Sequence, residues 1–96
     1  KNISINLIQN KVAQFYNISI SEFSAKKRNK NIVLPRQIAM YISRQVTNLS
    51  LPEIGLAFGG KDHTTVLHSC KKIEINLKKD SDLRNSVEKL ITSIQQ

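Results

Sequence analysis

Acidic residues, cysteine and tryptophan are scarce in this chain of 96 residues. It contains seven Asp and Glu against fifteen Lys and Arg, one cysteine and no tryptophan. A single cysteine, Cys70, allows no internal disulfide and no metal site built on several thiolates. No apolar run approaches the ~18 residues of a membrane-spanning helix, and the first residues do not have the pattern of a secretion signal. We therefore expect a protein of the reducing cytoplasm.

Several kinds of catalytic and cofactor site are also missing. The sequence has no Gly-x-x-x-x-Gly-Lys-Ser/Thr stretch, so we expect no ATP site and no other cofactor within it. His63 and His68 are five positions apart, about 140° around a helix, and cannot share one metal ion as an i, i+4 pair does. Asp62 adjoins His63 and no Gly-x-Ser-x-Gly elbow is present, which argues against a hydrolase. We expect no enzymatic activity.

The positive charge is concentrated in the middle of the chain. Between Lys26 and Lys79 there are eleven Lys or Arg and three acidic residues, so this span holds the whole net charge of +8. The four basic and four acidic residues outside it cancel. Such a concentrated excess is typical of a nucleic-acid-binding surface, although a basic surface that meets only solvent would give the same composition.

Apolar spacing predicts one all-α domain of six helices over residues 1–96, with no strand pattern. Spacings of four and three, for example, place Ile8, Val12 and Phe15 on the buried face of the first helix. The six helices are predicted over residues 3–17, 21–24, 35–47, 51–58, 62–79 and 80–94.

Three helix starts are predicted from single residues. Ser21 is expected to cap the short second helix, and Ser50 the fourth. Pro35 is expected at the first position of the third helix, because its missing N–H would have no partner there. The run Lys26–Asn31 before it has four cations and no apolar residue, and is therefore predicted as an exposed loop.

The stretch IGLAFGGKDHTTV over residues 54–66 predicts a helix-turn-helix. Two consecutive glycines adopt positive φ at little steric cost, so the chain can reverse after Phe58. Asp62 can then cap the following helix with its carboxylate. That helix should bury a stripe that includes Val66 and Cys70, which makes Cys70 an inert core thiol.

The first turn of this second helix carries side chains that suit base edges in a major groove. Asp62 can accept a hydrogen bond from a cytosine amino group, His63 can donate one, and Thr64 offers a hydroxyl and a methyl group. The alternatives are that Asp62 acts only as a cap and that His63 is a surface residue without a role.

Residues 59–68, GGKDHTTVLH, resemble the C-terminal DNA-binding domain of the bacterial chromosomal replication initiator DnaA. The similarity extends to SLPEIG at residues 50–55, to Pro35-Arg36-Gln37 and to the basic run, and so covers roughly residues 3–95. It implies a Trp-repressor-like helix-turn-helix fold that binds short A/T-rich boxes of double-stranded DNA at the replication origin. Because the chain begins with Lys1, we expect it to be a domain of a larger protein. The resemblance implies that the larger protein binds ATP and oligomerises through other domains, and we expect this domain itself to be monomeric.

The resemblance also implies roles for single residues. It places Arg28 in an A/T-rich minor groove, where the narrow walls concentrate negative potential. The alternative is that Arg28, like the other cations of the basic run, only touches phosphates. Lys61 stands where the family usually has Arg, so it keeps the charge and loses the two-pronged donor. The predicted base contacts are Arg28, Pro52, Asp62, His63 and Thr64, and the predicted phosphate contacts are Lys26, Lys27, Arg36, Arg44, Leu51, Lys61 and Thr65.

Two other functions stay open at the level of sequence. A transcription regulator of helix-turn-helix type would bind paired half-sites through a dimerisation element, and no such element is visible. A protein-interaction module would use the basic surface on acidic partners, but this gives no reason for Asp, His and Thr to gather beside two glycines.

Overall fold

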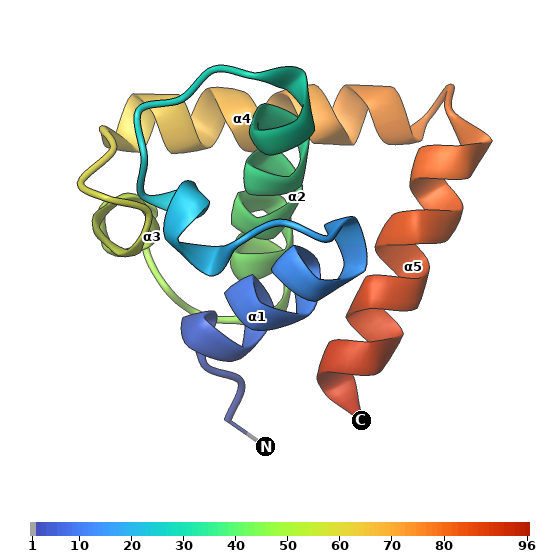
Figure 1. Ribbon diagram of the computed structural model, residues 1–96. Coiled ribbons are helices and arrows are strands. Elements are labelled where there is room, and N and C mark those ends of the chain that lie inside the picture. The colour runs from blue at the N-terminus through green and yellow to red at the C-terminus, as the bar shows by residue number, and fades with distance from the viewer. Residues whose placement is uncertain (1) are drawn as a thin grey trace.

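A computed structural model describes residues 2–96, which form five α-helices and one 3-10 turn and contain no strand (Figure 1). The predicted all-α class is confirmed. The predicted number of six helices is wrong, because the second of them is only the 3-10 turn. The elements are α1 (Ile5–Tyr16), η1 (Ile20–Phe23), α2 (Lys30–Val46), α3 (Leu51–Ala57), α4 (His63–Leu77) and α5 (Ser81–Gln95).

Helix α2 lies at the centre of the fold and packs against all four other helices. In Figure 1 helix α4 crosses one end of α2, α1 lies near the other end, and α5 runs down one side. The core between them is apolar and includes Ile38 and Ile42 of α2, with Phe58 and Ile73 fully buried beside them. No helix in the described part of the chain is long and apolar enough to cross a membrane.

Helix α1 ends as predicted at Asn17, which adopts the left-handed conformation at φ 55°. The prediction that Phe15 is buried is wrong, because 45% of it is exposed. The buried face of α1 is rotated toward Gln9 and Ala13. The Gln9 side chain can lie there because its amide donates to the carbonyl of Ala57 at 3.0 Å, which joins α1 to the end of α3.

Two predicted helix starts are also wrong. The 3-10 turn begins after Ser19 instead of Ser21, and the two serine hydroxyls lie 3.0 Å apart. Helix α2 begins at Lys30, five residues before Pro35, with the amide of Val33 bonded to the carbonyl of Asn29 at 2.8 Å. Proline is tolerated here because it removes only one helical hydrogen bond close to the exposed end of the helix. The predicted end of this helix near residue 47 is confirmed.

Helix α3 begins as its predicted cap implies, and α4 and α5 each begin within one residue of their predicted starts. Ser50 and Glu53 form a reciprocal capping box at the start of α3, with distances of 3.2 and 2.9 Å between side-chain oxygens and backbone nitrogens. Asp80 caps α5 by accepting from the amide of Leu83 at 3.0 Å. The predicted stripe of α4 is buried at Val66 and Cys70, which confirms Cys70 as a core residue.

Candidate nucleic-acid interface

The turn of the helix-turn-helix depends on its glycines. Gly59 and Gly60 have φ of 86° and 77°, as their sequence predicts. The amides of Gly60 and Lys61 both donate to the carbonyl of Gly55, at 3.1 and 2.9 Å. A Cβ on Gly55 would lie 2.1 Å from the carbonyl oxygen of Lys61. The glycine at this position therefore allows α3 and the start of α4 to approach closely.

The tip of α4 is a group of three linked, exposed side chains. Asp62 stands at the N-cap position, but its carboxylate makes no capping hydrogen bond, so that part of the prediction is wrong. One carboxylate oxygen instead accepts from the Thr64 hydroxyl, and the other lies 3.2 Å from Nδ1 of His63. The hydroxyl two residues away thus takes the place of the backbone amides, which leaves the first amides of α4 without a side-chain cap.

The hydrogen bond from Thr64 has a chemical consequence for the tip. It lowers the pKa of Asp62 below its ordinary value, and the nearby His63 lowers it further. Asp62 is therefore an ionised acceptor at neutral pH. Because all three side chains are exposed, they are available to a ligand that approaches the end of α4.

The loop between η1 and α2, residues 24–29, lies beside the turn of the helix-turn-helix (Figure 1). We call it the basic loop. A Cβ on Gly59 would lie 2.5 Å from the carbonyl oxygen of Ser24, so the two backbones are in direct contact. Beneath this contact Phe23 and Phe58 pack edge to face, with ring centroids 5.8 Å apart. The loop therefore has a fixed position relative to the tip of α4.

Arg36 holds the basic loop from the side of α2. Its guanidinium donates to the carbonyls of Ala25 at 3.1 Å and Lys27 at 3.0 Å, and only 8% of the residue is exposed. Burial, followed by the charge of Arg28, lowers the pKa of Arg36 from its ordinary value. The phosphate contact predicted for Arg36 stays a prediction. The sequence placed Arg36 directly after the expected helix start at Pro35, and its role in holding the loop was not predicted.

Lys61 approaches the same loop from the side of α4. Its ammonium donates to the carbonyl of Phe58 at 2.8 Å and lies 3.4 Å from the carbonyl oxygen of Ala25. Partial burial lowers the pKa of Lys61 from its ordinary value, and the charges of Arg36 and Lys26 lower it further. Lys61 is thus directed toward the loop backbone, whereas the sequence predicted only a phosphate contact.

A groove of about 660 Å³ lies between the basic loop and the turn of the helix-turn-helix and reaches the first turn of α4 at Thr65. The tip residues Asp62, His63 and Thr64 do not line it. Five of the predicted contact residues line it, and four of these are cations. None of the described residues that line it is acidic. The groove therefore offers concentrated positive charge to an anionic ligand. Its lining comprises Ser24, Lys26, Arg28, Val33, Arg36, Gly59, Gly60, Lys61 and Thr65.

Other predicted contact residues lie outside this groove. Leu51 and Pro52 form the first turn of α3, where Leu51 is half-buried and Pro52 is exposed. Arg44 lies in a separate depression together with Lys71 and Glu74. Lys27 is directed toward Glu22, with 3.8 Å between their charged atoms.

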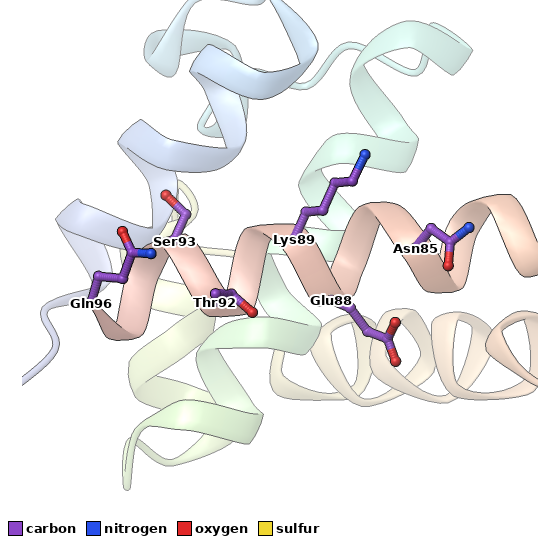
Figure 2. Close-up of a pocket in the computed structure, with 6 residues that line it drawn as sticks. All are labelled: Asn85, Glu88, Lys89, Thr92, Ser93 and Gln96. Atoms are coloured by element: carbon purple, nitrogen blue, oxygen red, sulfur yellow. The ribbon is translucent and has the colours of Figure 1, made fainter.

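A further depression follows the surface of α5, and it has a different character. Five of its six lining residues lie in α5 and the sixth, Gln96, directly follows it. Figure 2 shows their polar groups spread along the helix without converging on a common point. It includes both Glu88 and Lys89. Within residues 2–96, no three His, Cys, Asp or Glu side chains gather where they could hold a metal ion. The groove beside the basic loop is therefore the candidate site.

Comparisons with known proteins agree with this geometry. Residues 5–73 match the family described as "Bacterial dnaA protein helix-turn-helix". The chain is 62% identical over 88 residues to "Chromosomal replication initiator protein DnaA" of Limosilactobacillus reuteri (strain DSM 20016), covering 92% of this chain and 20% of that protein. For the protein of the same name from Limosilactobacillus fermentum, the identity is 55% over 93 residues, with 97% and 21% covered. The chain thus spans about a fifth of these relatives' length.

A solved structure is also similar. The chain superposes with a TM-score of 0.79 and 34% identity on a structure described as "Crystal structure of DNA replication initiation factor". The superposition covers 94% of this chain and 29% of the other.

Two glycine substitutions test whether the basic loop rests on the turn. Gly60→Ala should destabilise the fold by about 1–2 kcal/mol, because its positive φ strains an L-residue while its Cβ would meet nothing within 4 Å. Gly59→Ala has similar strain and adds a clash with Ser24. Its loss of unfolding free energy should therefore exceed that of Gly60→Ala by roughly 1 kcal/mol or more. Urea unfolding of both variants, followed by circular dichroism, measures the difference. Equal losses would contradict the contact.

Proposed function

The chain belongs to the family of the bacterial DnaA protein helix-turn-helix, and on this premise we propose that it binds specific sequences of double-stranded DNA. The target would be short A/T-rich boxes at the chromosomal replication origin, and the binding would help to initiate and regulate replication. The observation that carries this proposal is the cationic groove between the basic loop and the turn that leads into α4.

The position of the groove fits a duplex. A helix tip in the major groove and a loop in the adjacent minor groove must lie on either side of one sugar-phosphate strand. The strand between them would pass through the cationic groove, where Lys26 and Thr65 can contact its phosphates. The absence of acidic residues among the described lining residues removes the repulsion that a polyanion would otherwise meet.

The groove separates two different kinds of reader, and those at the tip of α4 lie outside its lining. On the α4 side, Asp62 would accept from a cytosine amino group, while His63 and Thr64 would donate to base edges or touch a thymine methyl. On the loop side, Arg28 is exposed and can enter a narrow A/T-rich minor groove. Pro52 is exposed at the start of α3, where its ring can make an apolar contact with a base.

The remaining contacts would position the domain without reading bases. Lys27, Arg44 and the amide of Leu51 lie outside the groove on three different elements, and we expect them to contact other phosphates of the duplex. Phosphate contacts by Arg36 and Lys61 would have to compete with the loop carbonyls that these cations already bind.

Residues 1–96 would form one non-catalytic, monomeric DNA-binding domain without a cofactor. Because the relatives are about five times as long, we place ATP binding and oligomerisation in other parts of the whole protein. The domain would act at the nucleoid, in the cytoplasm, where the chromosome lies.

Selection from a randomised duplex pool, with sequencing of the bound fraction, tests the proposed function. We expect one enriched unpaired box that combines G·C-containing and A/T-rich positions, because the chain offers one major-groove reader and one minor-groove reader. Enrichment of paired half-sites would favour a dimeric regulator. Absence of enrichment would contradict sequence-specific binding and favour a protein-interaction module.

Substitutions at the tip of α4 test the major-groove readout. His63→Ala and Thr64→Ala should each weaken binding to the selected box by about tenfold or more, with little effect on random duplex, because each removes a base contact. His68→Ala, on the exposed side of the same helix, is the matched control and should change neither affinity. Fluorescence titrations with both duplexes and thermal melting measure these effects. If both tip variants keep the specificity ratio of the parent, the tip does not read bases.

A further inference from the structure

The Lys61 ammonium is surrounded by carbonyl oxygens of the chain itself. Nζ lies 2.8 Å from the carbonyl oxygen of Phe58, 3.4 Å from that of Ala25 and 3.5 Å from that of Phe23. An ammonium has three N–H donors, so these three acceptors can satisfy it fully. Phe23 and Ala25 lie where η1 passes into the basic loop, 38 and 36 residues away in sequence. Lys61 therefore joins the turn of the helix-turn-helix to the loop.

Arg36 of α2 completes the attachment. Its guanidinium donates to the same Ala25 carbonyl and also to that of Lys27. A carbonyl oxygen has two lone pairs, so Ala25 can accept from Lys61 and Arg36 together. The backbone of the loop is thus held by one cation of α2 and one cation of the turn before α4.

The arrangement brings cations of the groove close together, and their mutual repulsion works against the stability of the unbound protein. Burial lowers the pKa of both Lys61 and Arg36, and each is further lowered by a neighbouring cation of the same groove. Two neutral donors would bind the carbonyls without this repulsion. A phosphate strand in the groove would relieve it, so bound DNA would favour the conformation in which the loop is attached.

We propose that Lys61 is a positioning residue that holds the basic loop in register with the tip of α4, so that the minor-groove and major-groove readers act as one unit. This inference rests on the proposed function. The alternative is that Lys61 only contacts a phosphate, as an exposed lysine of the groove would.

A double-mutant cycle with Arg28 separates these roles. Lys61→Met removes the donors and keeps a similar length, and Lys26→Met is the matched control, because Lys26 is an exposed lysine of the same groove. The ligand is the duplex most enriched from the randomised pool. In the parent and in Lys26→Met, adding Arg28→Ala should weaken specific binding by about tenfold.

In Lys61→Met the loop is no longer held, so Arg28 contributes less. In that background Arg28→Ala should weaken specific binding by only about twofold or less, compared with about tenfold in the parent. Lys61→Arg keeps charge and donors and should restore the full effect. Equal effects of Arg28→Ala in the Lys26→Met and Lys61→Met backgrounds would overturn the proposal, as would Lys61→Arg behaving like Lys61→Met.

Hydrogen exchange of the DNA-free protein gives a readout that does not depend on DNA binding. The amides of Ser24 and Ala25 are bonded to the carbonyls of Ser21 and Glu22, both at 3.3 Å, and should be protected. Lys61→Met should raise their exchange rates by roughly fivefold or more, while Lys26→Met leaves them unchanged. If the pool returns no enriched site, the proposed function fails. The exchange rates alone then test whether Lys61 holds the loop, and equal rates at Ser24 and Ala25 in the two variants would overturn that claim.

Discussion

Gly59 packs against Ser24 so closely that no Cβ would fit between them, and this contact sets where the basic loop lies relative to the tip of α4. Lys61 and Arg36 attach the loop at the same place through the Ala25 carbonyl. Both proposed reading surfaces depend on it, because a strand of fixed width must fit between them. A shift of the loop would misplace Arg28 even though every residue of the site were present.

The same arrangement explains why charge is concentrated here. Four cations line one groove without an acidic partner among the described lining residues, which costs electrostatic free energy in the unbound protein. The apolar core offsets this cost, since Phe23 and Phe58 are fully buried directly beneath the contact. The unbound protein can therefore keep this groove, and a bound polyanion would remove the repulsion between its cations.

The sequence was most informative where structure is set locally. The Ser50 cap, the glycine turn and the buried residues of α4 each follow from a few neighbouring residues, and all three are confirmed. Arg36 shows where such reasoning stops. Once α2 begins at Lys30, a stripe with spacings of four, three and four runs from Ile32 to Ser43 and includes Arg36 on the buried face. Its carbonyl partners, like the Phe23 and Ala25 carbonyls near Lys61, are brought close by tertiary contacts that the apolar periodicity does not reveal.

Neutralising single phosphates of the selected box with methylphosphonate tests most directly whether one strand passes between the loop and the helix tip. We expect the loss of affinity to concentrate on a few consecutive phosphates of one strand, between the bases read in the major groove and the A/T-rich step beside them. Replacing Lys26 by Met should reduce the loss at those phosphates and at no others. Losses spread evenly over both strands, or centred away from that junction, would contradict the account.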